Sequence, residues 1–321
     1  MLEARAEDGG SARPKLLVFT TCYNERDNIA PLIDQIAAAV PAADILVVDD
    51  NSPDGTWQII QSKSEQYPQL RSVMRPRKLG IGSAHKYALF YAMREGYATL
   101  VTMDADFSHD PAEIPALLQA HDKNVFVTGS RYCPGGSSDY TGMRDVVSRI
   151  GNVLARLALN LELRELTTYF RVFDVASIRR LPLRHVSASG YSYGVQLIYY
   201  LRKTGVELRE VPIHFVDRKG GSSKMPRVQI LISAVDLLVL ALRRLNLFRD
   251  LEPDTIVDCA CAGCGDRVLA MKSMGGKSMG AKFMGARSRP GATGRGADTP
   301  PVFVCLRCGL QQTPPNLSAG R

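Results

Sequence analysis

The sequence predicts an α/β protein in which a mostly parallel sheet is flanked by helices. Apolar runs typical of buried strands alternate with segments of helical periodicity from Lys15 to about Gly129. Two of these runs end in acidic clusters, Asp49-Asp50 and Asp104-Ala105-Asp106, which lie about fifty residues apart. Because the carboxyl ends of parallel strands face the crevice where open α/β sheets bind ligands, we expect both clusters to border one site.

The elements follow from local patterns. Continuous apolar runs predict strands, 3.6-residue periodicity predicts helices, and turn residues such as Asp54 and the pair Asp110-Pro111 predict helix starts. We expect Asp54 to be a turn or cap residue rather than a ligand, and His85 and His121 to lie on the surfaces of their helices. The expected strands are Lys15–Thr21, Asp44–Asp49, Ser72–Met74, Ala98–Met103 and Val125–Gly129, and the expected helices are Asn28–Val40, Thr56–Tyr67, Ser83–Glu95 and Asp110–His121.

Bulk composition limits the function classes. A chain of 321 residues holds one large α/β domain and a small appendage. Its net charge of +8 favours an anionic partner, namely a phosphate, a nucleotide, a nucleic acid or an acidic lipid surface. Residues 1–14 are small and polar, with no apolar stretch after a basic start. This pattern argues against a signal peptide and predicts a disordered N-terminus on a cytoplasmic, not secreted, protein.

An apolar segment, 226–250, follows the α/β region. Its centre, Val228–Leu242, is strongly apolar and is closed by Arg243-Arg244. About fifteen residues are too few to cross a bilayer, which needs roughly twenty. The segment is therefore either a core helix or a helix lying in the membrane interface.

The last part of the chain, 251–321, is rich in cysteine. Two Cys-x-x-Cys pairs have the layout of a zinc ribbon, since thiolates at this spacing fit tetrahedral Zn²⁺. The predicted structural zinc ligands are Cys261, Cys264, Cys305 and Cys308. Redox-active or unliganded thiols are the alternative. The pairs are separated by a glycine-rich basic stretch, 271–297, which predicts a flexible loop. Docking to a protein, binding to nucleic acid and simple packing all remain open as roles for this module.

The chain carries motifs suited to a nucleotide diphosphate. Tyr23-Asn24-Glu25 follows the first strand, where a ring and a carboxylate can contact a nucleobase. The alternative is a helix entry capped by Asn24 or Asp27. Asp104 and Asp106 can share a hard divalent cation that also binds phosphate oxygens.

Five ordered motifs resemble the inverting family-2 glycosyltransferases of GT-A fold, and more narrowly the dolichol-phosphate (polyprenol-phosphate) mannose synthases. The resemblance covers about Lys15 to Leu245 and places the GT-A domain at 15–225. It departs from the family pattern at Thr21, in place of proline, and at Thr168-Tyr169, in place of two small residues. The motifs are Tyr23-Asn24-Glu25, Val48-Asp49-Asp50-Asn51-Ser52-Pro53-Asp54-Gly55-Thr56, Lys78-Leu79-Gly80-Ile81-Gly82, Asp104-Ala105-Asp106 and Gly129-Ser130-Arg131-Tyr132.

The resemblance implies roles for individual residues. It implies a Mg²⁺ or Mn²⁺ ion on Asp104 and Asp106, with Asp106 and Arg131 as the catalytic residues. It also implies acceptor-phosphate contacts by Arg131, Arg144 and Ser148. The implied nucleotide-sugar contacts are Tyr23, Glu25, Val48, Asp50, Asp104, Ala105, Asp106, Arg131, Arg218 and Lys224.

The resemblance implies an inverting transfer of mannose from GDP-mannose to a polyprenyl monophosphate at the cytoplasmic membrane face, with or without a membrane subunit or docking protein. A phosphate monoester is largely a dianion near pH 7, so no general base is required. One alternative is another donor such as UDP-glucose. Another is a non-catalytic, nucleotide-sugar-binding regulator. Nucleic-acid binding by residues 250–321 is a third, less favoured, interpretation.

Overall fold

The computed structural model describes residues 15–139, 142–183, 186, 192–217 and 227–244, together with short parts of the cysteine-rich segment. Those short parts are residues 256–257, 261, 264, 270–271, 303–305, 307–308 and 311–312.

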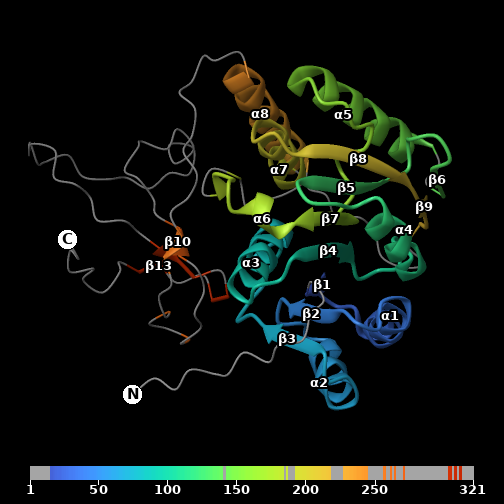
Figure 1. Ribbon diagram of the computed structural model, residues 1–321, viewed down its shortest axis with the longest axis vertical. Coiled ribbons are helices and arrows are strands. Elements are labelled where there is room, and N and C mark those ends of the chain that lie inside the picture. Colours follow the sequence, from blue (N-terminus) through green and yellow to red (C-terminus); the bar gives the residue numbers. More distant parts are fainter. Residues whose placement is uncertain are drawn as a thin grey trace, which may run out of the picture.

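A seven-stranded sheet forms the centre of the molecule, with strand order β3-β2-β1-β4-β7-β5-β8 (Figure 1). Neighbouring strands are parallel except at β7, which runs antiparallel to both β4 and β5. The mostly parallel α/β sheet predicted from the sequence is thus confirmed. The strands are β1 (Leu16–Cys22), β2 (Asp44–Asp49), β3 (Leu70–Met74), β4 (Thr99–Asp104), β5 (Val125–Ser130), β7 (Arg171–Asp174) and β8 (Glu207–Pro212).

Helices cover both faces of this sheet (Figure 1). Successive strand residues point to opposite faces, so β1 sends Leu17 and Phe19 into one core and Val18 into the other. The Val18 core is closed by α1, α2 and α4, and the Phe19 core by α3, α5, α6, α7 and α8. The helices are α1 (Arg26–Ala39), α2 (Thr56–Gln66), α3 (Ile81–Arg94), the 3₁₀ turn η1 (Pro111–Glu113), α4 (Ile114–Gln119), α5 (Met143–Leu159), α6 (Val175–Ile178), α7 (Ser192–Lys203) and α8 (Arg227–Arg244).

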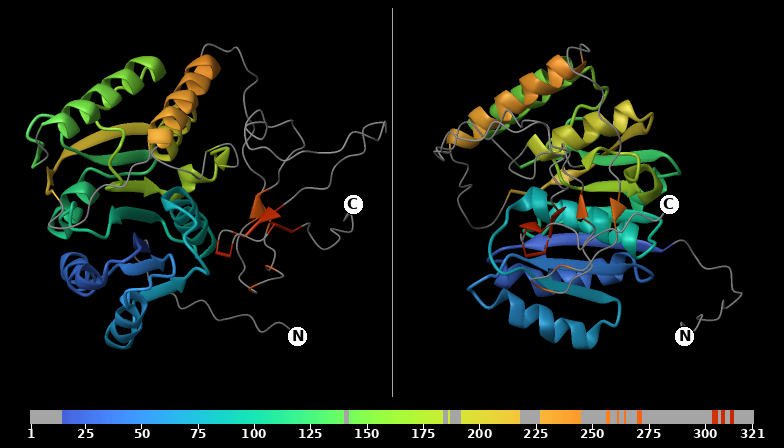
Figure 2. Two further views of the ribbon diagram at one scale, coloured as in Figure 1. Left: turned by 180° about the vertical axis from the view of Figure 1, so that it is seen from behind. Right: turned by 90° about the vertical axis from the view of Figure 1, so that its left-hand side faces the viewer.

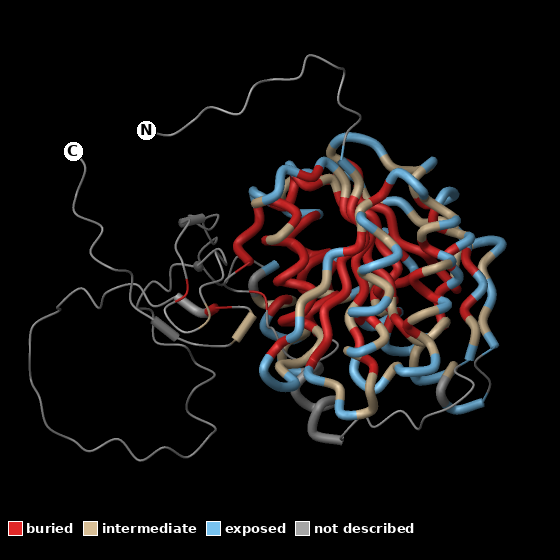
Figure 3. Tube along the Cα trace, turned by 90° about the horizontal axis from the view of Figure 1, so that it is seen from below, coloured by how far each residue is buried: buried red, intermediate tan, exposed pale blue. Residues whose placement is uncertain are grey.

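The structure corrects three sequence predictions. The helix expected over Asp110–His121 is divided into η1 and the short α4. The third strand begins at Leu70, two residues before the expected start. His85 is buried rather than on the surface of α3, because its ring packs between Phe19 of β1 and Tyr169. Figure 3 shows how buried positions fill the centre of the sheet region.

The apolar segment after 226 forms α8, which lies beside α5 at one end of the molecule in both views of Figure 2. Leu240 of α8 is buried, so one side of this helix belongs to the core. Among the helices described, none combines the length and hydropathy needed to cross a membrane.

Four short strands accompany the cysteine-rich segment, and a two-stranded ribbon lies beside β8. β10 (Ile256–Val257) pairs with β11 (Ala270–Met271), and β12 (Phe303–Val304) pairs with β13 (Gln311–Gln312), both antiparallel. The ribbon joins β6 (Ser137–Ser138) to β9 (His214–Phe215). Each cysteine pair thus lies next to its own short hairpin. Most of the predicted loop 271–297 and the predicted disordered segment 1–14 lie outside the described residues.

Candidate functional site

Both acidic clusters lie at the carboxyl edge of the sheet, on either side of β1. Cys22 at the end of β1 pairs with Asp49 of β2, and Thr21 pairs with Asp104 of β4. The two clusters therefore flank one strand end, as the sequence predicts. Topology brings them together, because β1 lies between β2 and β4 in the sheet.

The first cluster organises the loops that follow β1 and β2. Asp49 accepts a hydrogen bond from the Ser52 amide at 2.9 Å, and the Ser52 hydroxyl accepts one from the Asn24 amide at 2.9 Å. Asp54 accepts from the amides of Thr56 and Arg26, at 3.0 and 3.1 Å. It therefore ties the starts of α2 and α1 together from the turn before α2, whereas the N-cap positions themselves are Gly55 and Glu25.

Asp50 belongs to a buried ion pair that the sequence analysis did not anticipate. The Arg75 guanidinium, which has no exposed surface, binds the Asp50 carboxylate through Nε and the Ser83 hydroxyl through Nη1, the latter at 2.6 Å. The Leu79 amide donates to Asp50 at 3.3 Å. Burial raises the pKa of Asp50, and Arg75 opposes that shift. The sequence signal was weak, because Arg75 directly follows a strand but is one of three basic residues within four positions, with Arg77 and Lys78.

The remaining predicted base contacts differ in accessibility. Tyr23 is 37% exposed, and the Lys78 ammonium lies 4.1 Å from its ring centroid, a cation–π contact. Glu25 accepts a hydrogen bond from the Asn28 side chain at 2.7 Å. Val48 has no exposed surface, so it is the least accessible of the predicted nucleotide contacts that the structure describes. Tyr23 is the member of this group that offers a ring face at the surface.

The second cluster is supported by a buried histidine. Asp106 accepts from the Ser108 amide at 3.0 Å, and the Asp104 amide donates to Nδ1 of His109 at 3.1 Å. Since Nδ1 accepts, Nε2 carries the proton and donates to the Thr168 hydroxyl at 2.9 Å. Burial lowers the pKa of His109 to about 4, so the ring is neutral at pH 7.

Arg131 follows β5 and meets α5. Its Nε donates to Glu165 at 2.7 Å, and its Nη2 donates to Thr167 Oγ1 at 3.0 Å and to Ser148 Oγ at 3.5 Å. Ser148 also accepts from the Tyr132 hydroxyl at 2.9 Å. The structure therefore brings together Arg131 and Ser148, two of the three predicted acceptor contacts.

The structure gives no side-chain contacts for the three other predicted basic residues of the site, Arg144, Arg218 and Lys224. Arg144 lies in α5, one turn before Ser148, but its side chain is outside the described residues, as are Arg218 and Lys224 entirely.

Glu165, which the sequence analysis did not assign, joins the two halves of the site. It is fully buried and accepts from the amides of Thr167 and Thr168, at 2.9 and 3.2 Å. Burial favours its neutral form, but Arg131 and the Thr167 hydrogen bonds outweigh this and lower its pKa. An unbroken polar chain thus runs from the Asp104 amide through His109, Thr168 and Glu165 to Arg131.

The departure from the family pattern at Tyr169 is accommodated in the core. Tyr169 is 5% exposed, and its ring centroid lies 4.4 Å from that of His85. Burial lowers the pKa of His85 to about 3, so this ring is also neutral. Thr168 next to it bonds His109. The two bulky residues are therefore both buried, packed against His85 and His109.

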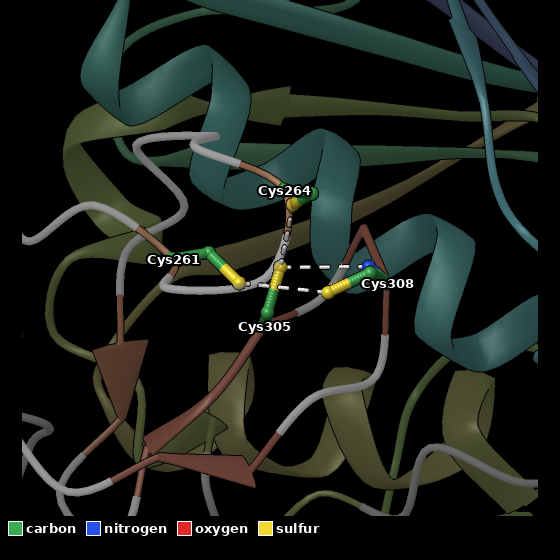
Figure 4. A group of neighbouring side chains, drawn as sticks. All are labelled: Cys261, Cys264, Cys305 and Cys308. Carbon is green, nitrogen blue, oxygen red and sulfur yellow. Dashed lines mark hydrogen bonds between the residues drawn. The ribbon is translucent and has the colours of Figure 1, made fainter.

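The four predicted zinc ligands form a cluster (Figure 4). Their sulfur atoms all lie within 4.8 Å of one another, with Cys261–Cys308 at 3.5 Å and Cys264–Cys305 at 3.7 Å. A disulfide requires about 2.05 Å, so these are not bonded pairs. Thiolates about 2.3 Å from a tetrahedral ion would be about 3.8 Å apart, so the cluster can hold a metal ion.

Comparisons with known proteins identify the family. Residues 17–181 match the model of glycosyl transferase family 2. The chain is 34% identical over 212 residues to an undecaprenyl-phosphate mannosyltransferase of Micrococcus luteus, covering 66% of this chain and 87% of that one. It is 35% identical over 228 residues to a polyprenol monophosphomannose synthase of Mycolicibacterium smegmatis, covering 70% and 86%.

Solved structures agree on the fold. A glucosyl-3-phosphoglycerate synthase of Mycobacterium tuberculosis, crystallised with Mn²⁺, uridine diphosphate and phosphoglyceric acid, has a TM-score of 0.53 at 19% identity. The match covers 76% of this chain and 83% of that one. A further mycobacterial protein has a TM-score of 0.52 at 18% identity, covering 80% and 83%. The strand order, the acidic edge and these matches agree: the chain belongs to glycosyl transferase family 2 and is a glycosyltransferase.

Proposed function

We propose that this enzyme transfers mannose, with inversion, from GDP-mannose to a polyprenyl monophosphate. The observation that carries the proposal is the polar chain from Asp104 through His109 and Glu165 to Arg131, which ties a donor-side cluster to an acceptor-side arginine. The names of the two relatives, each aligned over more than four fifths of its length, support mannose as the sugar and a polyprenyl phosphate as the acceptor.

The donor nucleotide would occupy the edge beside the first cluster. Tyr23 offers a ring face for a base, and Asp50 and Glu25 offer carboxylate oxygens for base and ribose groups. Val48 and Ala105 complete this set through the main chain, and Arg218 and Lys224 would close over the diphosphate. The buried Arg75 keeps Asp50 in a defined position before a nucleotide arrives.

The residues of the second cluster fit a divalent cation. Asp104 and Asp106 supply oxygen ligands from one short turn, the donor type that Mg²⁺ and Mn²⁺ prefer. A cation held there would neutralise charge on the departing diphosphate. His109 uses both ring nitrogens in bonds to the protein, and so it supports the turn rather than the ion.

The acceptor needs positioning rather than deprotonation. A phosphate monoester has a second pKa of about 6, so it reaches the site already as a nucleophile. Its oxygen would attack the anomeric carbon from the side opposite the diphosphate, and the bond to the diphosphate would break. Arg131, Ser148 and Arg144 would orient the phosphate, with Arg131 held by the ionised Glu165.

We also propose that the four cysteines bind a structural Zn²⁺ in a separate module, 251–321, which follows the GT-A domain of 15–225. The sulfur spacing supports this, because it is close to the edge length of a tetrahedral Cys₄ site. The enzyme would act as a peripheral protein on the cytoplasmic membrane face, with the module available to a membrane subunit or docking protein.

A radiolabelled donor panel tests the function. Purified enzyme is incubated with undecaprenyl phosphate and GDP-mannose, UDP-glucose or GDP-glucose, with Mg²⁺, Mn²⁺ or chelator. We expect cation-dependent label in the lipid fraction from GDP-mannose alone. Transfer from UDP-glucose would identify the alternative donor. Donor binding without any transfer would favour a regulator and contradict the proposal.

A further inference from the structure

Helix α5 has an apolar face directed outward. Its large apolar side chains recur at the three- and four-residue spacing of one helix face, yet they are 47–77% exposed. A helix of a globular protein normally turns such a stripe toward the core. The exposed residues are Met143, Val146, Val147, Ile150, Val153, Leu154 and Leu157.

Helix α8 extends this surface. Val235, Leu238 and Val239 are 36–59% exposed, at the same helical spacing, and α8 packs beside α5 (Figure 2). Arg244 fastens the two helices by donating to the Ala158 carbonyl at 3.0 Å. Of the twelve large exposed apolar side chains in the described part of the chain, seven lie on α5 and three on α8. These ten define the α5–α8 face.

The chemistry of the α5–α8 face suits hydrocarbon better than protein. All ten side chains are Met, Val, Ile or Leu, whereas protein interfaces are enriched in aromatic residues that pack directionally. Two exposed arginines border the face: Arg244 on α8, and on α5 Arg149, which forms an ion pair with Asp145 at 2.7 Å. An apolar stripe with arginines at its margin is the pattern of a helix that lies in the interface of an anionic bilayer.

The opposite side of α5 reaches the acceptor site. Ser148 meets Arg131, and Asn152 donates to the Ser148 carbonyl at 3.0 Å and accepts from the Leu166 amide at 2.7 Å. The same helix therefore has Ser148 at the phosphate-binding arginine and the apolar stripe on its outer surface. This arrangement suits an acceptor whose phosphate lies at a bilayer surface and whose chain lies within the bilayer.

We infer that the α5–α8 face rests on the membrane and presents Arg131 and Ser148 to the lipid phosphate. The sequence indicated a membrane contact only in the segment 226–250, whereas α5 supplies the larger share of this face. The inference rests on the proposed function for the identity of the acceptor, but bilayer binding itself does not require catalysis.

Vesicle sedimentation tests the inference with the full chain. The vesicles contain phosphatidylcholine and phosphatidylglycerol, without donor or acceptor. The variant Ile150→Ser/Leu154→Ser removes two exposed side chains from the centre of the stripe, and Met74→Ser, on a different exposed apolar residue, is the matched control. We expect the double variant to bind vesicles at least tenfold more weakly and the control to bind as the native chain does. Val147→Asn is a second variant, with a smaller expected loss, in case the double variant folds poorly.

Two results would overturn the inference. One is native-like vesicle binding by both α5 variants while their thermal unfolding is unchanged. The other is a native dimer that the double variant converts to monomer, with no vesicle binding by either, because the face would then be an interface between two copies. Transfer to a short, water-soluble polyprenyl phosphate separates this inference from the function. The double variant should still transfer mannose to this soluble acceptor. If the native chain did not, the proposed function would be contradicted but the membrane inference would not.

Discussion

The two acidic clusters end strands on either side of β1, yet their hydrogen-bond partners differ. In the first cluster Asp49, Asp50 and Asp54 bind amides, hydroxyls and a guanidinium of the protein itself, so they build the loops. In the second cluster, Asp104 and Asp106 lie on a turn that is held from behind by His109. Aspartates thus hold the loops together at the end of β2, and form a candidate cation site at the end of β4.

The largest expected effect is on the second cluster. Asp106→Asn removes a proposed cation ligand while keeping the size of the side chain, so we expect transfer to fall about 1000-fold, the scale of losing one strong electrostatic contact in a transition state. Initial rates of transfer at saturating donor measure this. Asp122→Asn, an exposed aspartate outside the site, is the control and should keep the native rate. If Asp106→Asn were as active as Asp122→Asn, Asp106 would not be a cation ligand and the second cluster would not differ from the first in this respect.

The next largest effect concerns the buried ion pair between Arg75 and Asp50 in the first cluster. Arg75→Met leaves the Asp50 carboxylate buried without its cation, so unfolding in urea should show a loss of about 3–5 kcal/mol. Arg71→Met, on an exposed arginine of β3, the strand that ends just before Arg75, should change stability by less than about 0.5 kcal/mol. Adding Asp50→Leu to Arg75→Met should recover much of the loss. If Arg75→Met were as stable as Arg71→Met, Asp50 would not be a framework residue.

The two buried histidines, His109 beside the second cluster and His85, predict that stability depends on pH. His109 has its pKa lowered from 6.5 to about 4, and His85 from 6.5 to about 3, so the unfolded chain binds more protons than the folded one below pH 6.5. Stability should therefore fall as pH drops from 6.5 toward 4, by about 2 kcal/mol per histidine at pH 5. Thermal unfolding between pH 7 and 5 measures this. His109→Asn should remove the His109 contribution and leave that of His85, so the profile should become about half as steep; an unchanged profile would mean that folding does not lower the pKa of His109.

The smallest effect returns to the first cluster. Asp54→Ala removes the carboxylate that fixes the starts of α1 and α2, so we expect a loss of about 1 kcal/mol in urea unfolding. Glu65→Ala, on an exposed glutamate of α2, is the control and should be nearly neutral. If the first of these variants instead abolished cation-dependent donor binding, Asp54 would belong to the site.

The sequence predicted the acidic edge because it depends on local patterns. Continuous apolar runs set β1, β2 and β4, and the acids follow at their ends. It did not predict β7, whose four residues, Arg171–Asp174, begin and end with charges, nor that this strand lies antiparallel between β4 and β5. Strand neighbours separated by more than forty residues are chosen by tertiary packing, which no local pattern contains.

In the candidate site, too, local patterns indicated some residues and only the fold revealed others. Motif spacing indicated Asp50 and Arg131 as candidates, but not their buried partners Arg75 and Glu165, because a buried charge is recognised by its partner in space. Periodicity indicates that α5 has an apolar face, but only the fold shows that it points outward. For His85 the pattern was misleading: its polarity indicated a surface position, but the rings of Phe19 and Tyr169 enclose it in the core.

Calorimetric titration of GDP-mannose, with and without Mn²⁺, tests most directly whether the two clusters have separate roles. We expect Mn²⁺-dependent binding to the native chain and to Asp54→Ala, and loss of that dependence in Asp106→Asn. Mn²⁺-dependent binding of native strength to Asp106→Asn would contradict this expectation.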